Sequence, residues 1–147
     1  MQIDYTLRLP AFEPAFIAQL SEFCPTVFDV SVLDLQWRLS SMPDASVFCA
    51  VSAGHLVGFK AGYAMSQLRY YSWLGGVHPS LRRQGVASKL MALQHAWLVE
   101  RGYCVVETAA NQENRPMAQA NLKHGFSVCG IRHEPQRVQV LFSKPLR

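Results

Sequence analysis

Near the N-terminus, apolar side chains recur at the three- and four-residue spacing of an amphipathic helix. This spacing predicts one helix over residues 10–25 and a second over residues 29–41. The apolar stripe of the first consists of Phe12, Phe16, Leu20 and Phe23. Pro43 follows the second stretch closely and stops it. The pattern therefore predicts two helices before any strand.

The chain then changes to short, nearly continuous apolar runs, which are typical of strands. The runs cover residues 47–51, 56–65 and 70–77, and a tight turn at residues 52–55 joins the first two. We therefore expect a hairpin followed by a third strand.

A helical period returns after a polar break at residues 82–85. It predicts a helix over residues 86–101, and Gly102 supplies the stop. A strand at 103–108, a helix at 115–124 and strands at 126–132 and 137–143 complete the predicted elements. Asn114 and Pro116 are residues typical of a helix start, so they mark where the last helix begins.

The resulting order, α-α-β-β-β-α-β-α-β-β, predicts a single α/β or α+β domain over residues 1–147. The strand–helix–strand unit at residues 70–108 is long enough to connect two parallel strands. Its polar loop then lies at the carboxyl end of the first strand, which is where open α/β sheets bind ligands.

The composition supports one globular domain and indicates which classes of partner the protein binds. Of the 147 residues, 50% are hydrophobic and 16% are charged, which supplies a core and argues against a disordered chain. The net charge of +4 favours an anionic partner. The N-terminus has no basic segment followed by an apolar run, and no stretch reaches the roughly 20 apolar residues of a membrane-spanning helix. We therefore expect a cytoplasmic protein with no membrane partner.

The four cysteines argue against a metal site. They are Cys24, Cys49, Cys104 and Cys129. None forms a C-x-x-C pair, so we expect no bound metal, and a chain of this length does not need disulfides to fold. Free, buried thiols are the expectation.

The polar loop at residues 82–89 carries the strongest chemical signal. Backbone N–H groups in the first turn of a helix have no partner within it, and their partial positive charge favours an anion. Gly85 lets a phosphate approach closely, while neighbouring arginines and Lys89 add positive charge. The spacing fits a pyrophosphate site but is neither a Walker A loop nor a G-x-G-x-x-G motif. An ordinary solvated loop is the alternative.

The loop and its surroundings resemble the acyl-CoA site of the GNAT family of N-acetyltransferases. In the pattern R-x-x-G-x-A, Arg82, Gly85 and Ala87 occupy the three defining places, directly after a strand. Asn114 and the later Gly125-Phe126 match a second family segment. The resemblance, over residues 45–143, implies a mixed, splayed central sheet with helices on both faces.

Carried over residue by residue, the resemblance implies acetyl-CoA as co-substrate. Gly75, Gly76 and Val77 would expose strand backbone to the pantetheine arm. Asn114 would hydrogen-bond to that arm or cap its own helix, and Asn121 would donate a hydrogen bond within the site. The pyrophosphate would be held by Arg82, Arg83, Gln84, Gly85, Val86, Ala87 and Ser88.

Two departures from the family pattern concern proton carriers. Asn121 stands where many members have the tyrosine that protonates the leaving thiolate, and Ala109 stands where many have a glutamate base. Glu107, two residues earlier, shares a strand face with Ala109 and is the first candidate for a replacement base. The alternative is a surface or ion-paired glutamate. Tyr71 is a second candidate proton carrier, although an aromatic residue there also fits a core or cleft wall.

The leading hypothesis is transfer of an acetyl group from acetyl-CoA to a primary amine in a ternary complex. The alternative, suggested by the two departures, is an acyl-CoA-binding or sensing module without chemistry. Nucleic-acid binding is disfavoured because the strand at residues 70–77 is predicted to be buried. The acceptor would be a small molecule or a peptide, with Asp29, Asp34 and Trp37 as candidates for its pocket. A homodimer is one option for the assembly.

Overall fold

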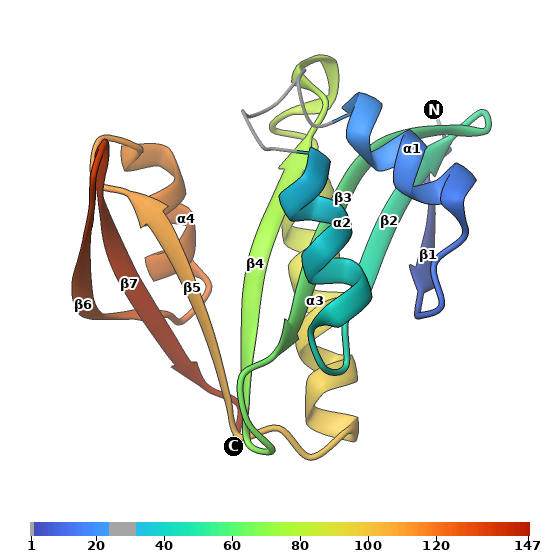
Figure 1. Cartoon of the computed structure of the whole chain (residues 1–147). Helices are drawn as coiled ribbons and strands as arrows, with labels where there is room; N and C mark the ends of the chain where they lie inside the picture. The colour runs from blue at the N-terminus through green and yellow to red at the C-terminus, as the bar shows by residue number, and fades with distance from the viewer. Residues whose placement is uncertain (1, 24–31) are drawn as a thin grey trace.

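Seven strands form one mixed sheet in the order β1-β2-β3-β4-β5-β7-β6, in a computed structural model that describes residues 2–23 and 32–147 (Figure 1). The strands are β1 (Asp4–Arg8), β2 (Ser46–Ser52), β3 (His55–Ala64), β4 (Arg69–Val77), β5 (Val105–Asn111), β6 (Ser127–Glu134) and β7 (Arg137–Pro145). The helices are α1 (Pro14–Phe23), α2 (Val32–Ser41), α3 (Val86–Glu100) and α4 (Arg115–Lys123), with a short 3-10 helix at Pro79–Leu81. Among these strands, only β4 and β5 pair in parallel.

The predicted fold class is confirmed, but the predicted order omits β1. This strand precedes the helices and pairs with β2, so the chain begins with a strand and not with α-α. β1 is short, lies at the sheet edge and alternates exposed with half-buried residues, so it lacks the continuous apolar run of the other strands. α1 begins at Pro14 and not at Pro10, and residues 24–31, which include one end of each predicted N-terminal helix, lie outside the described residues.

Helices cover both faces of the sheet. α1 and α2 pack on one face, where Val47 and Cys49 of β2 contribute to their core. Phe48, between these two, points to the other face and packs with Val86 and Leu90 of α3. The alternation of side chains along a strand thus sends neighbouring residues of β2 to opposite layers.

α4 lies on the same face as α3. The Oγ of Ser88 in the first turn of α3 is 3.1 Å from the Nε2 of His124, which follows α4. Further along α3, the ring of His95 meets Phe126 edge-on. These contacts place the end of α4 beside α3.

β4 and β5 share only a short ladder. It joins residues 69–71 of β4 to residues 105–107 of β5, after which the two strands diverge (Figure 1). At this point the Thr108 hydroxyl donates a hydrogen bond to the Ser72 carbonyl at 2.9 Å. β5 continues along β7. The opening between residues 72–77 of β4 and residues 108–111 of β5 is called the splay below.

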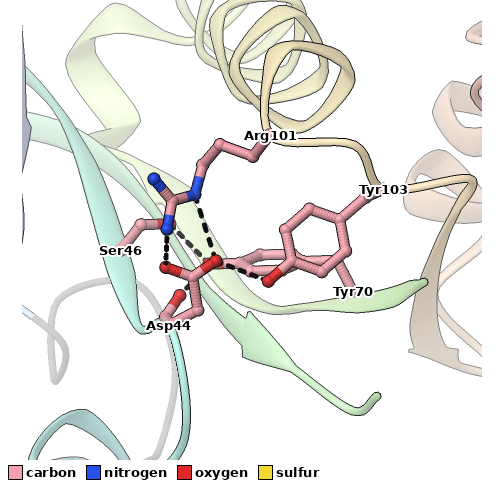
Figure 2. Close-up of polar contacts among 5 residues, drawn as sticks. All are labelled: Asp44, Ser46, Tyr70, Arg101 and Tyr103. Carbon is pink, nitrogen blue, oxygen red and sulfur yellow. Dashed lines mark hydrogen bonds and ion pairs between the residues drawn. The ribbon is translucent and has the colours of Figure 1, made fainter. Parts of the chain in front are cut away.

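A polar network holds the closed end of the splay (Figure 2). The Asp44 carboxylate accepts hydrogen bonds from Arg101 at 2.6 and 3.1 Å and another from the Tyr103 hydroxyl. The Tyr70 hydroxyl donates to the Asp44 carbonyl at 3.0 Å and lies 2.6 Å from the Oγ of Ser46, which therefore acts as the donor in that pair. Burial raises the pKa of both tyrosines, so their hydroxyls stay protonated. The network links the start of β2 to both strands of the splay.

We expect Tyr70→Phe to lower the free energy of unfolding by about 1–3 kcal/mol, because it leaves the fully buried Ser46 hydroxyl without this partner. Chemical denaturation measures the loss. Tyr5→Phe, on half-buried Tyr5 of β1, is the matched control, with an expected change below about 0.5 kcal/mol. The double variant Tyr70→Phe/Ser46→Ala is expected to lose less than the sum of the single losses. Fully additive losses would argue against the hydrogen bond.

Candidate functional site

A hollow lies where the chain passes from β4 into α3. Its volume is about 170 Å³, and it is lined by Val77, Leu81, Arg82, Arg83, Gly85, Val86, Ala87 and Ser88. Gly85 stands directly before the helix with a φ of 80°, a left-handed conformation that glycine adopts at little cost. The unpaired N–H groups of the first turn of α3 lie at the same place. The hollow therefore lies at the N-terminus of α3 and is lined by the residues of its first turn.

The hollow carries positive charge. Arg82 and Arg83 are exposed, and neither forms an ion pair within residues 2–23 and 32–147. Lys89 follows in the next turn, where its Nζ lies 6.0 Å from the ring centroid of Tyr5. A helix N-terminus beside two uncommitted guanidinium groups suits a phosphorylated ligand. Of the loop residues predicted to hold pyrophosphate, Gln84 alone is not part of the lining.

Asn114 caps α4. Its side-chain oxygen accepts a hydrogen bond from the Met117 N–H at 3.3 Å, and Pro116 lies in the first turn. The capping alternative is therefore confirmed. Binding of a ligand by the same side chain stays a prediction.

Beside the hollow, no strand of residues 2–23 and 32–147 pairs with the edge of β4 that faces β5. Gly75 and Gly76 pair with Lys60 and Phe59 of β3, and within the described residues the ladder to β5 has already ended. Backbone groups that face the splay are thus available to an extended ligand. A Cβ on Gly75 would lie 3.2 Å from the Phe59 carbonyl oxygen, so glycine fits this close approach.

Both candidate catalytic residues lie at the closed end of the splay, in the last pair of the ladder, on the face of the sheet that α1 and α2 cover, which is called the α2 face below. Tyr71 and Glu107 are register partners in the parallel ladder, so their side chains are neighbours. The Oε1 of Glu107 accepts a hydrogen bond from the Nη1 of Arg69 at 2.8 Å, which confirms that this glutamate is ion-paired. The rings of Tyr71 and Tyr63 pack edge-on with their centroids 5.6 Å apart, which agrees with a place for Tyr71 in the wall of a cleft. A catalytic role for either residue stays a prediction.

α2 adds an arginine to this face. Arg38 donates hydrogen bonds to the Tyr63 hydroxyl at 2.7 Å and to Asp34 at 3.1 Å, and its guanidinium lies 4.7 Å from the ring centroid of Trp73. Asp34 is therefore committed to Arg38. Trp37 is exposed on α2, while Asp29 lies outside the described residues. The predicted acceptor residues thus contribute one exposed aromatic ring and one ion-paired carboxylate.

The opposite face, the α3 face, holds buried polar side chains. Gln94, Ser72 and Asn121 are at most 2% exposed, and His95 is 8% exposed. Some of their polar atoms form no hydrogen bond within the described part of the chain. These atoms are Ser72 Oγ, Gln94 Oε1 and Nε2, His95 Nε2 and Asn121 Nδ2. A buried polar atom without a partner costs free energy that a polar ligand recovers. This face of the splay therefore suits a ligand with polar groups along its length.

Two lysines reach the α3 face. Lys144 Nζ lies 3.1 Å from His95 Nδ1, so Nδ1 accepts and the ring hydrogen belongs on Nε2. Burial, together with the charges of Lys144, Lys60 and His124, lowers the pKa of His95 to about 3 and keeps its ring neutral at pH 7. Burial also lowers the pKa of Lys60 to about 8. The side chains that lower the pKa of His95 on this face are thus all basic.

Sequence reasoning passed over Lys60, Gln94 and His95. A weak signal was present, since the lysine interrupts an apolar strand and the other two interrupt the apolar run of α3. A lysine in a strand also fits a solvent-facing position. Only the register opposite Gly75 and the contacts of α3 reveal the side to which these residues point.

The remaining predictions have mixed outcomes. Cys49 is buried as expected, and burial raises its pKa to about 11. Cys129 is exposed, contrary to expectation, because it lies on the outer strand β6; Cys24 lies outside the described residues. Across residues 2–23 and 32–147, no cluster of three His, Cys, Asp or Glu side chains could hold a metal. In the same residues, no helix combines the length and apolarity needed to cross a membrane.

The chain is similar to known acetyltransferases in both sequence and structure. The sequence model described as the Acetyltransferase (GNAT) family matches residues 11–126. The ribosomal-protein-S18-alanine N-acetyltransferase of Escherichia coli superimposes with a TM-score of 0.83 at 14% identity, over 97% of this chain and 94% of that chain. Among curated proteins, none matches the sequence.

Some of the similar structures were solved with acetyl-CoA or coenzyme A bound. A GNAT family acetyltransferase from Elizabethkingia anophelis with acetyl-CoA bound has a TM-score of 0.76 at 13% identity, over 97% of both chains. An aminoglycoside 6'-N-acetyltransferase complexed with coenzyme A has a TM-score of 0.75 at 14% identity, over 100% of this chain and 98% of that chain. These likenesses establish the shared fold.

Proposed function

Because the chain belongs to the acetyltransferase (GNAT) family, we propose that it transfers the acetyl group of acetyl-CoA to a primary amine in a ternary complex. The observation that carries the proposal is the hollow at the start of α3, which opens beside the unpaired edge of β4. A pyrophosphate suits the helix N-terminus with its two arginines. An extended arm that contains amides suits the free strand edge.

The hollow at the start of α3 and the edge of β4 would hold different parts of acetyl-CoA. The N–H groups of residues 83–88, with Arg82 and Arg83, would hold the phosphates, and the backbone of residues 75–77 would align the arm. Acetyl-CoA supplies an activated thioester. Holding it beside the amine converts a bimolecular encounter into a positioned reaction, which lowers the entropic part of the barrier.

The acceptor is proposed to approach from the α2 face. An ammonium group has no lone pair, so it must lose a proton before it attacks. Glu107 is the carboxylate that we propose as the base, acting directly or through water, and Arg69 holds it in place. Tyr63, Tyr71 and Trp73 form an aromatic wall on this face, and Arg38 lies against the rings of Tyr63 and Trp73. These features fit a small-molecule or peptide amine.

Glu107→Gln is expected to lower kcat by roughly 10- to 100-fold while leaving acetyl-CoA affinity unchanged, because the amide cannot accept the proton. Steady-state kinetics and calorimetry measure the two quantities. Glu100→Gln, on an exposed glutamate at the end of α3, controls for loss of a surface carboxylate. Unchanged turnover in Glu107→Gln would remove the base from the mechanism.

The proposed function is tested by calorimetry with acetyl-CoA, followed by assays of CoA release across a panel of amines. We expect acetyl-CoA to bind and at least one amine to release CoA. Binding without turnover on any amine would favour the acyl-CoA-sensing alternative, which the residues Asn121 and Ala109 motivate. Absence of binding would contradict both.

A further inference from the structure

Lys60 lies one strand inside the edge of β4, on the α3 face of the sheet. Gly58 and Gly62, two residues before and after it on β3, both face α3, since a Cβ on them would contact Val86 and Gln94. The strand alternation therefore sends Lys60 to the same side. Its backbone pairs with Gly75, and its Cγ lies 3.5 Å from where a Cβ on Gly75 would be. The first part of the lysine side chain therefore lies beside Gly75, where β4 has no side chain to block it.

The reach of Lys60 fits the splay. Adjacent strands lie about 4.8 Å apart, and four methylenes separate the lysine Cα from Nζ, so the side chain is long enough for the ammonium to reach the β4 edge. The charge of Lys60 contributes to the lowered pKa of both His95 in α3 and His124 after α4, which agrees with its place on the face of the sheet that these helices cover. This is the side of the splay opposite Glu107 and Tyr71.

The surroundings of Lys60 favour an anion. The charged groups that act on His95 and His124 are all basic, namely Lys60, Lys123 and Lys144, with His124 also acting on His95. Asn121 Nδ2 and the hydrogen-bearing His95 Nε2 are buried donors without a partner in the described residues. A buried site with positive charge and unused donors stabilises negative charge more strongly than water does.

We propose that Lys60 is the acid for the leaving thiolate and takes the place of the tyrosine that position 121 lacks. This inference rests on the proposed acetyl transfer. The amine nitrogen forms a bond to the acetyl carbon, the carbon–sulfur bond breaks, and the electron pair on sulfur takes a proton from the Lys60 ammonium. The proton lost by the amine passes through Glu107 or water to solvent, from which Lys60 is recharged.

Lys60 suits this task better than His95 does. With a pKa of about 8, Lys60 is mainly protonated at pH 7 and close to the ordinary thiol value of about 8.5, which favours proton exchange in both directions. His95, with a pKa of about 3, is neutral and can donate only a hydrogen bond. Asn121 is limited in the same way.

The test measures the thiol pKa of CoA bound to the protein, from the ultraviolet absorbance of the thiolate. In the wild type we expect bound CoA to titrate about one unit below free CoA, because the Lys60 cation favours the thiolate. Lys60→Met is expected to abolish this shift and to lower kcat about 100-fold, with little change in CoA affinity. Lys60→Arg is expected to keep the shift. Arg132→Met, on an exposed arginine of β6, is the matched control for loss of a cation and should titrate as the wild type does.

Each outcome separates this inference from the proposed function. If CoA binds but its thiol pKa is the same in the wild type and in Lys60→Met, the role of Lys60 is overturned and acetyl transfer stands. If Lys60→Arg loses the shift as fully as Lys60→Met does while both bind CoA, charge is not the cause and the role is again overturned. If CoA does not bind to the wild type, the proposed function fails and this inference fails with it.

Discussion

Gly85→Glu is expected to abolish acetyl-CoA binding, with at least a roughly 100-fold loss of affinity. The substitution places a carboxylate at the start of α3, where the helix dipole, Arg82 and Arg83 otherwise favour phosphate. A side chain at this position also has to adopt a φ of 80°, which costs about 1–2 kcal/mol. Calorimetric titration with acetyl-CoA measures the loss, and thermal unfolding measures the strain separately.

Gly54→Glu is the matched control for this variant. Gly54 has a φ of 79° in the turn between β2 and β3, and a Cβ there has nothing within 4 Å, as at Gly85. Both variants therefore carry the same backbone strain and the same added charge, but only one of them lies in the hollow. Equal loss of binding in the two variants, or undiminished binding in Gly85→Glu, would place the phosphate site elsewhere.

Acidification is expected to destabilise the protein through His95. Its pKa is about 3 in the folded chain against an ordinary value near 6.5, so below pH 6.5 the unfolded chain binds a proton that the folded chain does not. Stability is thus lost as the pH falls from 6.5 towards 3. At about 1.4 kcal/mol for each pKa unit, the full contribution is roughly 3–5 kcal/mol.

His95→Gln isolates this contribution. Urea unfolding at a series of pH values is expected to give a shallower loss of stability in the variant, because carboxylates titrate alike in both proteins and cancel in the comparison. The introduced amide retains an oxygen that can accept a hydrogen bond from Lys144. His55→Gln, on an exposed histidine of β3, controls for the loss of a histidine as such. Parallel curves for the wild type and His95→Gln would contradict a buried, neutral His95.

The fold was predictable because its helices and inner strands have clear periods. The apolar stripe of α3 and the continuous run of β4 predict the strand–helix–strand unit, which is long enough to connect parallel strands. β1 was not predictable in this way, because its stability comes from backbone pairing with β2 and not from an apolar run of its own. Tertiary pairing at an edge leaves little trace in the sequence.

Some parts of the candidate site could be predicted from the sequence and others could not. The loop around Gly85 follows from local chemistry, since a helix start, a glycine and arginines all occur within a few residues. Lys60 and His95 lie far apart in the sequence, and only the packing of α3 on β3 brings the charge of one to act on the other. Glu107 was predicted, but its ion pair with Arg69 depends on strands that are distant in the sequence. A motif whose residues are close together in the sequence is therefore easier to predict than a contact between residues that are distant in the sequence.

The most direct test of the account is a crystal structure of the protein with acetyl-CoA. We predict that the pyrophosphate accepts hydrogen bonds from the N–H groups of residues 83–88 and that the arm lies along residues 75–77 of β4. The sulfur is predicted to lie on the α3 face within reach of Lys60, with Glu107 on the opposite side of the thioester. A cofactor bound away from the start of α3, or an arm that does not enter the splay, would contradict the account.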